Sequence, residues 1–206
     1  MNIAVLASGE GTTLQAVLDA CVSGRLPARV GVVVSNNAAA GALRRARSAG
    51  VPTRHLSATS AGGAGRLDQA LSETLLEFAT DLVVLAGYMK RLGPVTLAAF
   101  AGRIINIHPA LLPQFGGQGM FGMNVHRAVV AAGERTSGAT VHWVDGSYDT
   151  GAVIAQVRVA VAPGDSAESL AVRVQAAERE LLVEVLEAAA SGRLRPPQQA
   201  PVSATS

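Results

Sequence analysis

Residues 103–113, RIINIHPALLP, are the stretch that decides how this 206-residue chain folds. The three isoleucines are β-branched and typical of a strand that is buried on both faces of a sheet. Side chains two positions apart point to the same side of a strand, so Asn106 and His108 leave this strand together before Pro109 ends it. Because ligands of open α/β sheets bind beyond the carboxyl ends of the strands, this amide and imidazole mark a candidate site. The alternative is a strand end whose histidine is paired locally.

The first half of the chain alternates between apolar runs and segments with helical spacing. The apolar runs predict strands at residues 2–7, 30–34, 53–56, 81–86 and 103–108. The spacing between them predicts helices from about Leu14 and at residues 39–49, 67–79 and 95–100, with a glycine-rich surface loop at 61–64. This alternation predicts a parallel sheet with helices on both faces.

The second half breaks this rhythm. Residues 139–144 and 152–161 predict two further strands, and the short turn between them favours antiparallel pairing. Helices are expected at 125–132 and from Asp165-Ser166 to about residue 189. Residues 114–124, QFGGQGMFGMN, are glycine-rich without periodicity, which leaves open a mobile loop over a site or a plain surface loop. We therefore predict an α/β protein whose parallel sheet carries helices on both faces and ends in an antiparallel pair.

Composition and charge exclude several classes of function. Aromatic residues make up 3% of the chain and the net charge is +2, so nucleic acid would find neither a stacking surface nor a basic patch. The single Cys21 excludes an internal disulfide, and no histidines stand at a metal-binding spacing, so no metal is expected. With no signal peptide and no apolar run of about 18 residues, we expect a cytoplasmic protein that does not enter a membrane. One domain is expected over residues 1–194, followed by a disordered tail at 195–206.

Two further segments carry residue types suited to chemistry. In SGEGTTL, residues 8–14, glycines and a helix start would present free N–H groups and hydroxyls to a phosphate, although an ordinary strand–helix turn is equally compatible. In GSYDTG, residues 146–151, Asp149 would hold the ring of His108 and favour its charged form if the two strands are close. The alternative for Asp149 is a turn-forming aspartate. His142 and His126 are weaker candidates near the same site.

Three blocks in this order and spacing resemble the folate-dependent formyltransferases: SGEGTTL, NIHPALLP and GATVHWVDGSYDTGAVIAQ. The resemblance covers about residues 1–194. Within the family, the chain is most similar to the enzymes of purine synthesis that formylate N1-(5-phospho-D-ribosyl)glycinamide (GAR). The resemblance implies a three-layer, Rossmann-like α/β fold with a mostly parallel seven-stranded sheet and one antiparallel strand. It also implies 10-formyltetrahydrofolate as co-substrate and GAR as the other small-molecule partner. It leaves a homodimer open.

The resemblance also implies roles for individual residues. Asn106 and protonated His108 would stabilise the oxyanion that forms when the amine attacks the formyl group, and Asp149 would support His108. The other implied sites are a substrate-phosphate site at Gly11, Thr12 and Thr13, a glycinamide site at Gln175 and Glu178, and a folate pocket at Arg66, Met89, Lys90, Arg91, Leu92 and Asn106. At Glu10 the family often has Asn or Ser, and a carboxylate there disfavours phosphate unless it points outward.

Several rivals share parts of this pattern. Methionyl-tRNA formyltransferase carries an added C-terminal domain, and formyltetrahydrofolate deformylase carries an added N-terminal domain, and neither is expected in this chain. Sugar-nucleotide formyltransferases do not generally share the SGxGTxL loop. A non-catalytic phosphometabolite-binding protein is a rival of another class, and the intact set of Asn106, His108 and Asp149 counts against it.

Overall fold

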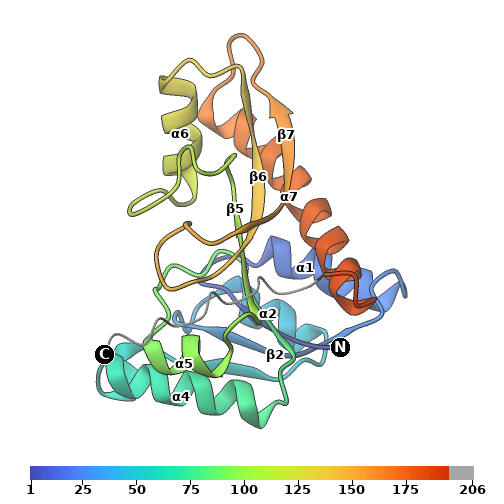
Figure 1. Ribbon diagram of the computed structural model, residues 1–206, viewed down its shortest axis with the longest axis vertical. Helices are drawn as coiled ribbons and strands as arrows, with labels where there is room; N and C mark the ends of the chain where they lie inside the picture. Colours follow the sequence, from blue (N-terminus) through green and yellow to red (C-terminus); the bar gives the residue numbers. More distant parts are fainter. Residues whose placement is uncertain (195–206) are drawn as a thin grey trace, which may run out of the picture.

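The computed structural model describes residues 1–194 of the chain, and its centre is a seven-stranded sheet in the order β3-β2-β1-β4-β5-β6-β7 (Figure 1). The strands are β1 (Asn2–Leu6), β2 (Arg29–Ser35), β3 (Thr53–His55), β4 (Leu82–Leu85), β5 (Ile104–His108), β6 (Thr136–Trp143) and β7 (Val153–Ala160). The helices are α1 (Thr12–Val22), α2 (Gly41–Ser48), α3 (Ala58–Ala61), α4 (Ala64–Glu77), α5 (Pro94–Ala99), α6 (Met123–Ala131) and α7 (Ala167–Ala190). The predicted tail at 195–206 lies outside the described residues.

Strand directions confirm the predicted sheet. β1 pairs in parallel with β2 and β4, while β3 and β5 extend the parallel part on either side. β6 is antiparallel to both β5 and β7, so it is the one strand in this sheet that runs against the others. The expected antiparallel pair at 139–144 and 152–161 is therefore confirmed.

Several element boundaries differ from the sequence prediction by one to three residues, and one helix was not expected. The short helix α3 ends at the first residue of the expected glycine-rich loop at 61–64, and its first turn is capped reciprocally by Ser57 and Ser60. α4 already starts at Ala64, the last residue of that loop. β6 starts three residues earlier than expected. It includes Gly138, which packs so closely against β7 that a Cβ atom would lie 2.0 Å from the Val157 carbonyl oxygen.

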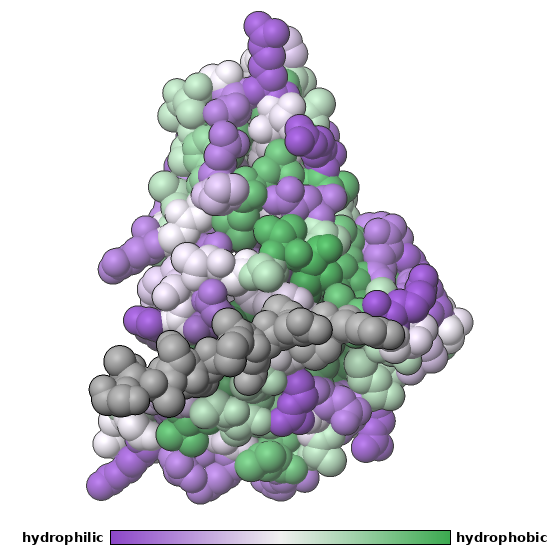
Figure 2. Space-filling model, viewed as in Figure 1, coloured by the Kyte–Doolittle hydropathy of each residue, from purple (hydrophilic) through white to green (hydrophobic). Residues whose placement is uncertain are grey.

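Helices cover both faces of the sheet, as the strand–helix alternation predicted. On one face Ile3 and Val5 contact α1, α2 and α7, and on the other Ala4 and Leu6 contact α4 and the α5 region. α6 packs on the amino-terminal half of α7. Hydrophobic residues gather near the middle of the face shown in Figure 2, around the region of β7 and α7, and hydrophilic residues cover most of its two ends. In the described part of the chain, no helix is both long enough and apolar enough to cross a membrane.

The topology concentrates loops at one edge of the sheet. The chain order reverses between β1 and β4, which lie side by side although β2 and β3 separate them in sequence. Such a switch point leaves a crevice outside the carboxyl ends of the strands. The loops after β1, β4 and β5 all leave the sheet there.

Candidate active site

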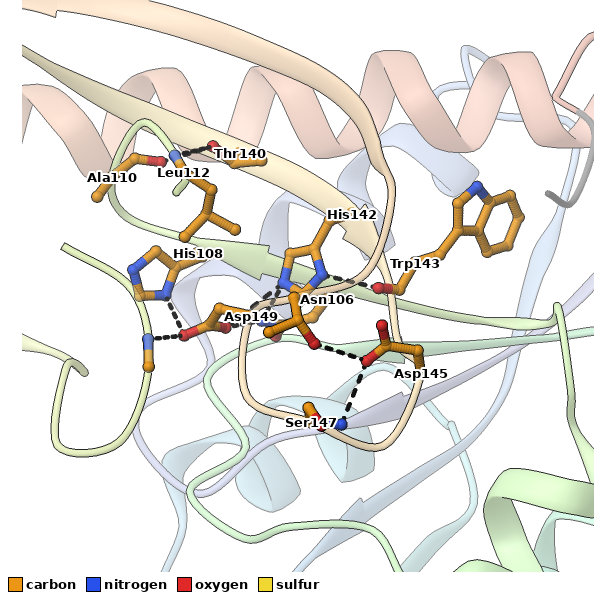
Figure 3. Close-up of polar contacts among 12 residues, drawn as sticks. Asn106, His108, Ala110, Leu112, Thr140, His142, Trp143, Asp145, Ser147 and Asp149 are labelled. Atoms are coloured by element: carbon orange, nitrogen blue, oxygen red, sulfur yellow. Dashed lines mark hydrogen bonds and ion pairs between the residues drawn. The ribbon is translucent and has the colours of Figure 1, made fainter. Parts of the chain in front are cut away.

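β5 places its two polar side chains at the centre of the site. Asn106 lies between Leu85 of β4 and His142 of β6, and His108 lies opposite Thr140. The Thr140 hydroxyl donates to the Ala110 carbonyl oxygen and accepts from the Leu112 N–H, so it fixes the chain after His108 (Figure 3). The predicted strand with an amide and an imidazole at its end is present.

The loop between β6 and β7 brings Asp149 to these two residues (Figure 3). One carboxylate oxygen, Oδ2, lies 3.5 Å from His108 Nδ1 and accepts from the Gly117 N–H at 2.9 Å. The other, Oδ1, is 3.4 Å from Asn106 Nδ2 and 3.5 Å from His142 Nε2. The Asp149 side chain is 11% exposed. Burial raises the pKa of Asp149. Its contact with His142, the charge of His108 and the Gly117 N–H together lower the pKa by more than burial raises it, so the net pKa lies below the ordinary value. Asp149 is therefore a carboxylate at neutral pH.

His108 is buried and has an acceptor at each ring nitrogen. Nε2 lies 2.8 Å from the Phe115 carbonyl oxygen, and Nδ1 faces Asp149. Only the imidazolium donates to both acceptors at once. Burial lowers the pKa of His108, and although Asp149 and the Phe115 carbonyl raise it, the net pKa lies below the ordinary value. Burial thus favours the neutral form of the His108 ring, whereas its two hydrogen-bond partners favour the cation.

His142 belongs to the site, although sequence reasoning ranked it only as a weak candidate. Its Nδ1 lies 2.8 Å from the Trp143 carbonyl oxygen and is therefore protonated, which leaves Nε2 to accept from Asn106 Nδ2 at 3.0 Å. This tautomer orients the Asn106 amide. The signal in the sequence was the alternation of Thr140 and His142, but their partners became visible only through the register of β6 against β5.

One cavity of about 490 Å³ contains this cluster. Several residues that the family resemblance singled out line it: Met89, Lys90, Arg91, Leu92, Asn106, His108, Asp149, Gln175 and Glu178. The glycine-rich segment also lines it through residues 117–122, and its Phe115 carbonyl and Gly117 N–H contact the two catalytic candidates. The segment therefore lies over the site, as one of the two alternatives expected, and its mobility stays a prediction.

The amino-terminal glycine loop borders this cavity without lining it. The Ser8 hydroxyl accepts from the Met89 N–H at 2.8 Å, which ties the loop to the cavity wall. Gly11 has φ +73° and precedes α1, whose first N–H groups it leaves open. Glu10 points outward to Arg44, 3.4 Å away. The phosphate candidates Gly11, Thr12 and Thr13, and the exposed Arg66, are not among the described residues that line the cavity.

Two more titratable groups face the cavity from the helices. Glu178 on α7 is half-buried, and burial raises its pKa to about 7, against a smaller lowering by Arg179. His126 on α6 is buried, and its Nδ1 has no hydrogen-bond partner among residues 1–194. Burial and the charge of His108 both lower the pKa of His126. Within residues 1–194, no cluster of three or more His, Cys, Asp or Glu side chains is arranged to hold a metal ion.

Residues 1–186 match the family model described as formyl transferase. This match spans most of the chain, and the chain therefore belongs to the formyl transferase family and is an enzyme that transfers a one-carbon group. Its fold and its cluster of amide, imidazole and carboxylate agree with that assignment.

Named relatives narrow the similarity within the family. Phosphoribosylglycinamide formyltransferase of Haemophilus influenzae is 40% identical over 194 residues, which cover 94% of this chain and 89% of that protein. The enzyme of the same name from Escherichia coli (strain K12) is also 40% identical, over 95% of this chain and 90% of its own length. The crystal structure of glycinamide ribonucleotide transformylase 1 from Symbiobacterium toebii superposes with a TM-score of 0.90 at 42% identity, covering 96% of this chain and 91% of that one.

Proposed function

We propose that this enzyme transfers the formyl group of 10-formyltetrahydrofolate to the amine of GAR, and that residues 1–194 act as one formyltransferase domain. The observation that carries the proposal is the convergence of Asn106, His108 and Asp149 on one cavity in a chain similar to GAR formyltransferases over nearly its whole length. The cavity has the size of a small-molecule site, because ligand pockets of about 300–1,000 Å³ hold drug-sized compounds.

Asn106 and His108 are the proposed oxyanion donors. The amine nitrogen forms a bond to the formyl carbon, and negative charge develops on the formyl oxygen. One Asn106 N–H is bound to His142, and the other makes only the long 3.4 Å contact with Asp149, so it is free to turn to that oxygen. For His108 to donate as well, Nε2 leaves the Phe115 carbonyl. Removing one donor of this kind typically costs on the order of 10²–10³ in rate.

Asp149 is proposed to hold His108 in place and to favour its charged form. The bond from the formyl carbon to N10 of the folate then breaks, the amine loses one proton and N10 gains one. That proton passes through His108 or through a water held by Asp149. The step forms no covalent bond to the protein.

The two substrates are proposed to enter from different sides of the cluster. The folate lies against Met89, Lys90, Arg91 and Leu92, with Arg66 at its far end. The phosphate of GAR binds Gly11, Thr12 and Thr13 at the start of α1, and its glycinamide end reaches Gln175 and Glu178. Because Glu10 turns to Arg44, its charge does not face the phosphate.

A formyl-transfer assay tests the proposal. The purified protein is mixed with GAR and 10-formyltetrahydrofolate, tetrahydrofolate release is followed, and the product is identified by its mass. Release that requires GAR and yields formylated GAR supports the proposal. Release without GAR, with formate as product, would identify a deformylase instead. Stabilisation against heat by UDP-sugars but not by GAR would point to a sugar-nucleotide formyltransferase.

A further inference from the structure

The loop that carries Asp149 is tied to the opposite wall of the cavity by one side chain. Arg91 Nε donates to the Gly146 carbonyl oxygen at 2.8 Å, and the guanidinium lies 6.0 Å from the centre of the Tyr148 ring. Arg91 follows β4, on the wall proposed for the folate, whereas Gly146 and Tyr148 precede Asp149. The guanidinium thus links two segments that line the cavity.

The loop needs such a tie because its own conformation is strained and the other contacts that its middle makes outside are mostly long. Asp149 has φ +55°, a backbone conformation that residues other than glycine adopt at a cost. Inside the loop, the Asp145 carboxylate accepts from the Ser147 N–H and the Thr150 hydroxyl. The ends of the loop are held by backbone bonds, from the Val144 N–H to the Ile104 carbonyl oxygen at 3.0 Å and from the Trp143 N–H to the Ala152 carbonyl oxygen at 2.9 Å. Between residues 145 and 151, the described residues other than Arg91 that bond to the loop from outside reach it through the Asp149 carboxylate, mostly over 3.4–3.5 Å.

The wall that presents Arg91 is itself fixed. The Met89 N–H donates to Ser8, Leu92 is 6% exposed, and the Asp68 carboxylate accepts from the Val95 and Thr96 N–H groups at the start of α5. α5 also limits the far side of the loop, since a Cβ at Gly146 would lie 3.2 Å from Leu97 Cδ1. Arg91 therefore connects a fixed wall to the middle of a loop that is otherwise anchored at its two ends and through the Asp149 carboxylate.

We propose that Arg91 is a positioning residue that latches the Asp149 loop, so that the folate wall sets the position of the Asp149 carboxylate against His108. This inference rests on the proposed function of the same site and goes beyond it, because it gives the Arg91 side chain a target in the protein in addition to its place in the folate wall. Arg91 acts through Asp149 and does not touch the reacting atoms.

A double-mutant cycle tests the latch. Arg91→Leu is expected to lower kcat about tenfold, within the 10²-fold that a displacement of about 1 Å can cost. In the Asp149→Asn background the same change is expected to lower kcat by less than about twofold, because the carboxylate it positions is gone. Arg91→Lys keeps the positive charge but loses the planar guanidinium, so its kcat is expected to lie between those of wild type and Arg91→Leu. Equal losses in both backgrounds, or a higher KM for folate at unchanged kcat, would show that Arg91 only contacts substrate and would overturn the proposal.

A second measurement needs no substrate. The pKa of His108 is followed by NMR in the ligand-free protein. If the carboxylate drifts away in Arg91→Leu, the pKa of His108 falls toward its value in Asp149→Asn, whereas loss of the guanidinium charge alone would raise it. Arg54→Leu is the matched control, because Arg54 also lies over an aromatic ring, that of Phe78 at 4.8 Å, far from the cavity. An unchanged or raised His108 pKa in Arg91→Leu refutes the latch, even if wild-type protein fails to formylate GAR and the proposed function falls.

Discussion

Replacing Asp149 by Asn tests the core of the proposed chemistry. The side chain keeps its shape but loses the negative charge that lies 3.5 Å from His108 Nδ1. An opposite charge within about 4–6 Å favours the charged form of a group, so its removal should lower the pKa of His108, already lowered by burial, still further. At a fixed pH above that pKa, each further unit of lowering cuts the protonated fraction about tenfold. Because protonated His108 is the proposed donor to the oxyanion, we expect kcat to fall about 10²-fold or more.

The same variant has a smaller effect on folding, and this effect can be separated from the chemistry. An Asn side chain offers one oxygen where Asp149 offers two, so either the Gly117 N–H or the Asn106 amide loses its acceptor. A buried donor without a partner costs about 1–3 kcal/mol. For a domain of this size, each kcal/mol lowers Tm by about 2–4 °C, so the variant stays folded at 25 °C. Its KM values are expected to remain within about threefold of wild type.

The assay is steady-state tetrahydrofolate release at saturating GAR and 10-formyltetrahydrofolate. Asp19→Asn is the control, because it removes the same charge from an exposed position on α1, outside the cavity. A kcat for Asp149→Asn within about threefold of the control would remove Asp149 from the mechanism. A raised KM at unchanged kcat would move it to substrate binding.

Three further predictions concern the parts around the cluster. Gly11→Ala should raise the KM for GAR and lower stability by about 1 kcal/mol or more, because φ at this position is +73° and the new Cβ would lie 2.6 Å from Ala42 Cα. A thermal melt measures the loss of stability, and a titration with GAR measures the change in KM. The pKa of Glu178 is raised from 4.5 to about 7, so its contribution to the free energy of unfolding is present below pH 4.5 and lost as the pH rises through 7. In urea melts, Glu178→Gln should therefore lose about 3 kcal/mol less stability than wild type over this pH range. An unchanged pH profile of stability would contradict this prediction. Asp68→Ala removes the acceptor of the Val95 and Thr96 N–H groups at the start of α5. The change should lower the free energy of unfolding by about 1–3 kcal/mol and raise the KM for folate. Equal KM values for variant and wild type would argue against a role for α5 in the folate wall.

The sequence predicted the parts of the site that depend on local pattern. The period of a strand put Asn106 and His108 on one side, and proline at 109 ended the strand, so the pair needed no tertiary information. Asp149 was predicted from its turn and from the expected pairing of two strands, and the structure brings it to His108. The helix α7 was predicted with its start, because Asp165 and Ser166 are residues that cap helices.

Other parts of the site depend on contacts that no local pattern encodes. The role of His142 follows from the register that sets it opposite Asn106, and a shift of one residue would turn it to the other face. The contacts of Phe115 and Gly117 are made by backbone groups, which every residue carries, so their identity gave no signal. α3 was missed because its only strong signal is a reciprocal cap between Ser57 and Ser60.

The reversed direction of β6 explains why the site depends on a loop. In a wholly parallel sheet each strand would deliver its catalytic residue at the same edge as His108. β6 instead ends opposite the start of β5, where Trp143 pairs with Ile105 and the Val144 N–H reaches the Ile104 carbonyl oxygen. The chain must therefore fold back over the sheet before Asp149 reaches His108, and the carboxylate that faces His108 sits on a strained segment rather than on a strand end. Its position is then set by whatever holds that segment, which is why a change at Arg91, outside the reacting groups, is expected to act on kcat.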